Sequence, residues 1–250
     1  MRKLLFLLIM ITPILGFAQK KRAKVPSYFG IVIRPIIPIN AFGAGPFDVK
    51  GNGLEATITP KMGFSFGGTV RAGITKLLAI ETGITFVRRN YNTRYSYPDS
   101  SLTGSSQLGI ISYDIPLNLL VYVKIKGNFY MNVSMGASAT LYPSNVRAED
   151  NHYPYAFVTE GARKGWFTGA LNANIGFEYR TEKSGFFYLG GSFQYPFGSI
   201  YRVASVYKYK NQSFIAFGNM GGAYITAELK YFFPTIKNKG EQFRPGPIEQ

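Results

Sequence analysis

Apolar and polar residues alternate along much of this chain, most regularly over residues 128–141. Met131 and Val133 fall on one parity there, and Asn132 and Ser134 fall on the other. Side chains two residues apart share one face of a β-strand, so this segment predicts a strand with one apolar face and one face of small polar groups. About thirteen residues tilted by about 40° rise on the order of 30 Å, enough to cross a hydrocarbon layer. We expect lipid on one side and a narrow polar lumen on the other.

The same alternation recurs along the chain, and Pro35 and Pro38 interrupt only its first occurrence. Counting that weaker segment, the pattern predicts eight strands, at residues 28–37, 64–74, 78–89, 111–125, 128–141, 167–180, 186–197 and 224–233.

Short and long connections alternate between these strands. Tight turns are expected near 75–77, 126–128 and 182–185, and longer loops near 40–60, 92–109, 143–165 and 200–221. Strict alternation of this kind is typical of outer-membrane barrels, which have short periplasmic turns and long extracellular loops. The predicted fold is an all-β, eight-stranded antiparallel up-and-down transmembrane β-barrel with both termini in the periplasm.

A secreted soluble barrel with apolar residues inside is the alternative, because periodicity alone does not separate the two. The polar faces are rich in Gly, Ser, Thr and Asn, whereas a solvated face would be rich in Lys and Glu. Small polar groups fit the narrow lumen of an eight-stranded barrel. The side-chain choice therefore favours the membrane barrel.

The N-terminus has the features of a signal peptide. Arg2 and Lys3 precede an apolar run from Leu4 to Phe17, and small residues stand at the −3 and −1 positions before a cleavage site after Ala18. We therefore expect an exported chain placed in the outer membrane. Its predicted parts are a signal peptide (1–18), a periplasmic linker (19–27), the barrel (28–233) and a polar periplasmic tail (234–250).

Composition supports a lipid-facing surface. Charged residues make up 16% of the chain and aromatic residues 16%, whereas a soluble surface usually carries about 25–35% charged side chains. The net charge is +15, but the basic residues are scattered and many fall at strand ends, where they can meet lipid phosphates. We therefore expect lipopolysaccharide and phospholipid as partners, and no nucleic acid.

Ionisable residues on the inward parity predict a polar network in the lumen. Unpaired buried charge is costly, so acids and bases there should pair. A structural plug is favoured over a gated polar path, because side chains fill an eight-stranded barrel. The expected members are Arg34, Arg71, Glu81, Arg89, Asp114, Lys124, Glu178, Arg180, Glu228 and Lys230.

The chain has little catalytic chemistry to offer. It has no cysteine and one histidine, His152, on the longest predicted loop. No G-x-S-x-G element is present to hold a nucleophilic serine, and one imidazole does not make a multi-histidine metal site. The sequence predicts no enzyme, no cofactor and no metal.

Tyrosines are frequent in the long predicted loops. Tyr is favoured at binding surfaces, although ordinary surface loops also contain it, so both interpretations stay open. The candidate recognition residues are Tyr95, Tyr97, Tyr153, Tyr155, Tyr207 and Tyr209.

Three segments resemble the outer-membrane β-barrel domain of PorT-like proteins from the Bacteroidetes. They are residues 63–68 (GFSFGG), 79–84 (AIETGI) and 111–118 (ISYDIPLN). In that family a Tyr-x-x-Ile-Pro-Leu element opens the fourth strand, whereas here a single residue separates Tyr113 from Ile115-Pro116-Leu117. The resemblance covers roughly residues 28–233. The tail after the last strand departs from barrels that end on an aromatic residue of that strand.

The resemblance implies a role in the cell envelope, since the founding member is needed for protein export by the type IX secretion system. The function expected is a non-enzymatic accessory of secretion or envelope assembly that binds secretion or envelope proteins through its loops and periplasmic face. The alternatives are a passive small-solute channel and, third, a lipid-modifying barrel enzyme.

Overall fold

The computed structural model describes residues 27–75, 77–98, 101–181 and 184–234. The predicted signal peptide, most of the predicted linker and nearly all of the predicted tail lie outside these residues. Among the described residues, no helix is long and apolar enough to cross a membrane.

Eight long strands pair in a closed ring, which we call the barrel. Each pairs antiparallel with the next along the chain, and the first pairs with both the second and the last. All eight predicted strands are present. They are β1 (Ser27–Ile37), β3 (Leu54–Gly73), β4 (Leu78–Tyr97), β5 (Leu102–Lys126), β6 (Phe129–Leu141), β9 (Phe167–Arg180), β10 (Phe186–Pro196) and β13 (Tyr224–Phe232).

The all-β class, the antiparallel pairing and the up-and-down order are confirmed, but the ring is uneven. Strands β3 and β4 have 20 residues and β5 has 25, whereas β13 has 9 and β1 has 11. Three strands therefore continue well past the rest of the ring.

The four long connections are folded, so the prediction that they are loops is wrong. Their residues form the outer parts of β3, β4 and β5 together with five further strands. These are β2 (Phe47–Gly51), β7 (Val146–His152), β8 (Tyr155–Arg163), β11 (Tyr201–Tyr209) and β12 (Gln212–Met220).

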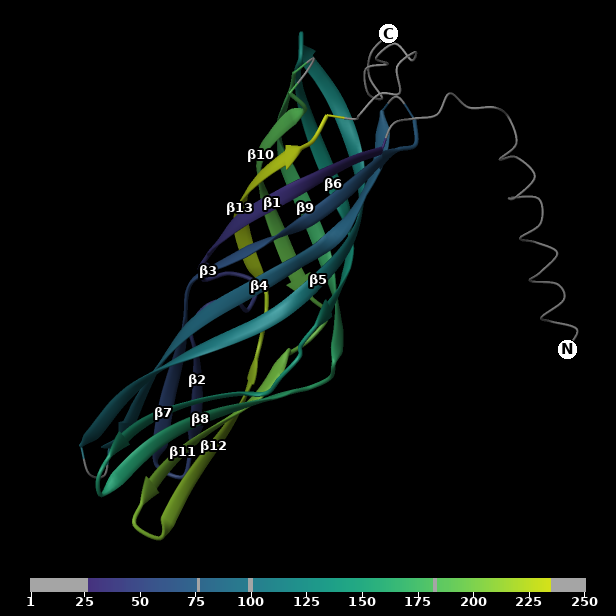
Figure 1. Ribbon diagram of the computed structural model, residues 1–250. Helices are drawn as coiled ribbons and strands as arrows, with labels where there is room; N and C mark the ends of the chain where they lie inside the picture. Colours follow the sequence, from purple (N-terminus) through teal and green to yellow (C-terminus); the bar gives the residue numbers. More distant parts are fainter. Residues whose placement is uncertain (1–26, 76, 99–100, 182–183, 235–250) are drawn as a thin grey trace, which may run out of the picture.

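Two sheets make up this outer part, which we call the extension. One sheet is β2 with the outer parts of β3, β4 and β5, and the other has the order β12-β11-β8-β7. Strands β5 and β7 are neighbours along one side, and β2 and β12 are neighbours along the other. Figure 1 shows β2, β7, β8, β11 and β12 grouped beyond one end of the ring, with β3, β4 and β5 running into the group.

An apolar core fills the extension. Tyr95 and Phe157 stack across it with ring centroids 5.0 Å apart. Fully burying side chains of this size stabilises a fold by roughly 1.5–3 kcal/mol each, which is why these segments fold. Its buried members are Val49, Leu54, Ala56, Ile58, Tyr91, Tyr95, Leu108, Ile110, Tyr142, Ala148, Phe157, Ile200, Tyr201, Val203, Tyr207, Ala216 and Met220.

The chemistry of the two faces inverts along the long strands, as β4 illustrates. In the barrel, Glu81 is buried inside and Ile84 is 56% exposed outside. Further along, Tyr95 is buried inside and Arg88 and Arg94 are exposed outside. A wall that meets lipid should be apolar outside, and one that meets water should be polar outside with an apolar core. The inversion therefore indicates where the lipid-facing wall ends.

Candidate functional site

Seven ionisable side chains form one connected network inside the barrel. Arg71 donates to Glu81 from Nε (2.8 Å) and Nη2 (2.6 Å), and its Nη1 pairs with Glu178. Arg180 Nε donates to Glu178 Oε1 at 2.6 Å. Lys230 continues the chain by pairing with Glu81. The complete order is Arg34, Glu228, Lys230, Glu81, Arg71, Glu178 and Arg180.

The charged side chains of this network are buried away from water. Glu178 and Glu228 are fully buried, and Arg71 and Lys230 are 2% exposed. Aromatic rings cover the cations: the Arg71 guanidinium lies 4.2 Å from the Phe232 ring centroid. Charges in such an environment are stable only when they are paired.

Three predicted members of the network lie elsewhere. Asp114 accepts a hydrogen bond from the Tyr224 hydroxyl at 2.9 Å, nearer the extension. Arg89 donates to the Gly222 carbonyl and to the Tyr142 hydroxyl, both at 3.0 Å. Lys124 is exposed at the turn end of β5 and joins none of the ion pairs.

Amides and hydroxyls, which are not among the charged candidates, form further hydrogen bonds inside the barrel, beside Arg34 and Asp114. Asn174 Nδ2 donates to Ser134 Oγ at 2.8 Å, and Asn172 Nδ2 donates to Asn118 Oδ1 at 3.3 Å. The inward parity of these residues was visible in the sequence, but only contacts show that they bond to one another across the lumen.

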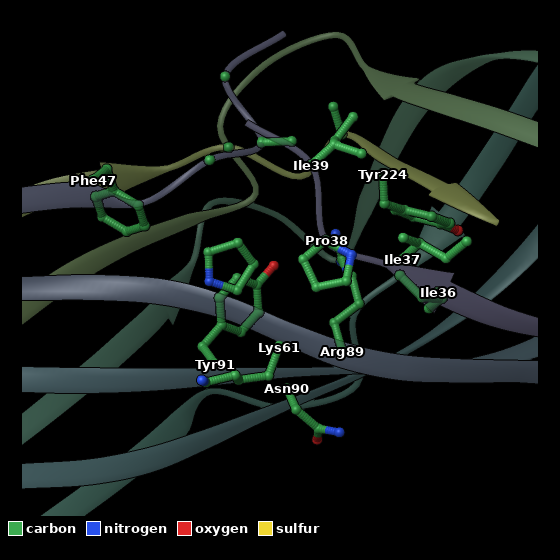
Figure 2. Close-up of a pocket in the computed structure, with 16 residues that line it drawn as sticks. Ile36, Ile37, Pro38, Ile39, Phe47, Lys61, Arg89, Asn90, Tyr91 and Tyr224 are labelled. Carbon is green, nitrogen blue, oxygen red and sulfur yellow. The ribbon is translucent and has the colours of Figure 1, made fainter. Parts of the chain in front are cut away.

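The cavities at this level have the size of single water molecules. One of about 20 Å³ borders Arg34 and Asp114. Another of about 30 Å³ lies where the barrel meets the extension, with Arg89, Tyr91 and Tyr224 in its lining (Figure 2). A cavity needs about 10–15 Å³ to hold one water. Neither of these two cavities has room for more than a few water molecules.

The loop tyrosines are mostly part of the extension core. Tyr95 and Tyr207 are 2% and 4% exposed, so placing them on open recognition loops was wrong. Tyr97, Tyr155 and Tyr209 pack against the same core and are partly buried. Of the six, Tyr153 alone is fully exposed, at the tip of the β7–β8 hairpin.

Burial in the extension favours neutral tyrosines. It raises the pKa of the Tyr201 hydroxyl to about 12 and also raises the pKa of Tyr95. The Tyr201 hydroxyl donates to the Ser144 carbonyl at 2.7 Å, and the Tyr95 hydroxyl is within 2.6 Å of Ser106 Oγ. These hydroxyls hold strands of the extension together rather than offering contacts to a partner.

An open groove of about 650 Å³ lies on the outer face of the extension, where the sequence predicted only loops. Strands β3, β4 and β5 contribute side chains in two rows: Glu55, Ser96 and Thr103 are aligned, and so are Thr57, Arg94 and Ser105. The end of β7 completes the groove with Asp150 and His152. Its lining is polar and carries both signs of charge.

Asp150 holds the edge of this groove in place. Its Oδ2 accepts a hydrogen bond from the Ser105 amide at 2.7 Å, and its Oδ1 is 2.9 Å from His152 Nε2. The side chain of His152 is 53% exposed. No local sequence pattern predicts the contact between Ser105 and Asp150, because it joins residues 45 positions apart on β5 and β7. Among the described residues, no group of three or more His, Cys, Asp or Glu could hold a metal ion.

Comparison with known proteins finds similarity in structure alone. No protein-family model and no curated protein matches the chain. The crystal structure of the outer membrane protein OprG from Pseudomonas aeruginosa is similar, with a TM-score of 0.50 and 13% identity over 85% of this chain and 98% of that one. The outer membrane protease OmpT from Escherichia coli covers the same shares at 11% identity, with a TM-score of 0.34. The chain thus has the fold of an outer-membrane β-barrel.

The expectation that the chain is not an enzyme has to be corrected. A protease is among the similar barrels, so a fold of this kind does not exclude catalysis, and the prediction is withdrawn. At that TM-score the likeness assigns no activity to this chain.

Proposed function

We propose that this chain is an outer-membrane protein with a closed lumen that binds a protein partner through its extension, as a PorT-like accessory of secretion or envelope assembly. The similarity to OprG supports the outer-membrane location. The proposal places both chain termini and the short turns in the periplasm, and the extension outside the cell.

The observation that carries the proposal is the contrast between the two ends of the molecule. The lumen is filled by a buried network from Arg34 to Arg180, whereas the extension is folded and presents an open groove of about 650 Å³. A rigid surface binds with a smaller loss of conformational entropy than a mobile loop would. The groove therefore suits recognition better than the lumen suits transport.

The partner is tested by crosslinking in intact cells. A photoreactive residue at Thr103, exposed in the groove, should capture an envelope or secreted protein. The same residue at Ser213, exposed on β12 away from the groove, is the matched control. Recovery of lipid alone, or of the same proteins from both positions, would show that the groove is not the binding site.

The channel alternative is tested with the purified protein in planar bilayers. Since the lumen is packed to water-sized cavities, we expect no steady single-channel current. A sustained open current would refute the closed lumen and favour solute passage.

A further inference from the structure

A β-bulge in β3 turns two consecutive side chains outward at the edge of the lipid-facing wall. The register of β3 against β4 shifts between Lys61 and Phe64, and both Lys61 and Met62 are exposed. Bulges commonly re-aim a side chain in this way. Without the extra residue, the parity of the strand would allow only one of the two to point outward.

Arg88 on β4 lies next to this bulge. It pairs with Phe64, and Asn90, two residues further on, pairs with Lys61. Both Lys61 and Asn90 are in the lining of the small cavity (Figure 2). Diagonal neighbours on adjacent strands are about 7–8 Å apart at the backbone, so the long side chains of Lys61 and Arg88 can both reach one phosphate group that lies over Asn90.

The local contacts leave both cations available. Within the described part of the chain, neither Lys61 nor Arg88 forms an ion pair. Asn90 Nδ2 instead donates to the Met62 carbonyl at 2.9 Å, which fixes the bulge. The Arg88 guanidinium extends towards β5, where an added methyl group on Gly109 would lie 3.8 Å from its Nη2. Since Asn90 pairs with Gly109 on one side and with Lys61 on the other, Asn90 lies between the guanidinium and Lys61.

Next to these two cations, on the side towards the barrel, aromatic rings cover the same outer face of the sheet. The rings of Phe66 and Phe86 are 5.2 Å apart, and Phe86 is 5.9 Å from Tyr113. Phe66 is 51% exposed and Ile111, opposite Arg88, is 38% exposed. Two unpaired cations thus lie immediately above an apolar surface on which acyl chains can pack.

We propose that Lys61 and Arg88 bind the phosphate group of a membrane lipid whose acyl chains pack against Phe64, Phe66 and Phe86. The inference rests on the membrane location proposed above. A lipid phosphate is favoured over free phosphate because the apolar surface adjoins the cations. Their charge attracts the anionic headgroup, and the aromatic rings keep its tails in place.

Native mass spectrometry of the purified full chain in detergent tests the proposal. The probe is phosphatidic acid, compared with diacylglycerol of the same acyl chains and with inorganic phosphate. We expect the wild-type chain to bind phosphatidic acid. The double variant K61Q/R88Q should bind it about 25-fold more weakly, since each cation near a membrane surface contributes about fivefold. If the double variant does not fold, K61Q alone should show the fivefold loss.

The matched control is K208Q/K210Q, which removes two exposed cations from the β11–β12 hairpin. It should bind phosphatidic acid like the wild type. Equal binding by K61Q/R88Q and wild type, or an equal loss in the control, would overturn the site. Displacement of the lipid by inorganic phosphate at the same concentration would refute lipid as its ligand. Membrane fractionation of the wild-type chain separates these results from failure of the proposed location.

Discussion

At the scale of single residues, Arg71 matters most for the barrel interior because it joins two carboxylates that have no access to water. It contacts Glu81 and Glu178, on opposite sides of the lumen network. Lys230 and Arg180 each keep one of these carboxylates paired from the other side. Removing the guanidinium would deprive Glu81 and Glu178 of one cationic partner each, at a place closed to water.

Arg71→Met should therefore lower the free energy of unfolding by about 3 kcal/mol or more, since breaking a buried pair costs about 3–5 kcal/mol. Urea unfolding in lipid vesicles, followed by the fluorescence of the single tryptophan, measures this change. Arg147→Met is the control, because that arginine is 52% exposed in its ion pairs and should have little effect. Similar unfolding midpoints for both variants would contradict a structural role for the network.

A second residue-scale prediction concerns the medium that each outward side chain meets. Val133 is 45% exposed and lies between Val121 and Ile175 on the neighbouring strands. Val133→Arg should cost about 2–4 kcal/mol if this position is near the bilayer midplane. Asn92→Arg, on the outer face of β4 beyond the polarity inversion, should cost little. Equal destabilisation in the same vesicle assay would show that the wall at Val133 does not face lipid.

At the scale of elements, the alternation predicted the strands of the barrel, but not the extension. On β4 the parity never changes, but the inward side chains pass from Glu81 to Tyr95 while the outward ones pass from Ile84 to Arg94. The alternation that predicts these strands has apolar residues outside and polar residues inside, and it stops where the inversion begins. The pattern therefore predicts loops where the strands in fact continue.

The sequence predicts the ion-pair network better than the groove, because the network follows from local alternation and the groove does not. Inward parity and the need to pair buried charge predict all seven members of the ion-pair network, but not its order. They also select Arg89, Asp114 and Lys124, which form none of its ion pairs. The groove depends on contacts between distant segments, such as Ser105 with Asp150. No local pattern encodes such a contact.

Two consecutive glycines of β10 give an element-scale prediction. A Cβ on Gly190 would lie 2.4 Å from both the Ile175 carbonyl and the Tyr188 hydroxyl, whereas a Cβ on Gly191 would meet only the Thr226 carbonyl at 3.6 Å. Gly190→Ala should thus destabilise the barrel by about 1–3 kcal/mol through overpacking, and Gly191→Ala should be close to wild type. The urea midpoints of the two variants test this, and the reverse order would contradict the close strand approach.

At the scale of the whole molecule, the barrel and the extension share three continuous strands, although their outer faces suit different surroundings. The barrel has its polar groups inside, and the extension has its apolar core inside. Because β3, β4 and β5 run through both, the extension is held at the mouth by sheet hydrogen bonds on one side and by its own core on the other.

The extension should lose stability at high pH. Its buried Tyr201 has a pKa of about 12, against about 10 in an unfolded chain. The folded state thus binds this proton more tightly, so the stabilisation is complete below pH 10 and is lost as the pH rises towards 12. The difference in tyrosinate absorbance between the wild type and Tyr201→Phe should titrate near pH 12 in the folded protein and near pH 10 in urea. Titration near pH 10 in both would show that this hydroxyl is not buried.

The polarity inversion also bears on hydrophobic mismatch. Moving the barrel along the membrane normal by one row of side chains would carry Arg88 into hydrocarbon at one edge, or lift the Phe86 row into water. Either displacement is unfavourable, so the depth of the protein is fixed by its own strands. A bilayer thicker or thinner than the apolar wall must therefore deform around this protein, and the local thickness of the membrane becomes a property that the barrel imposes.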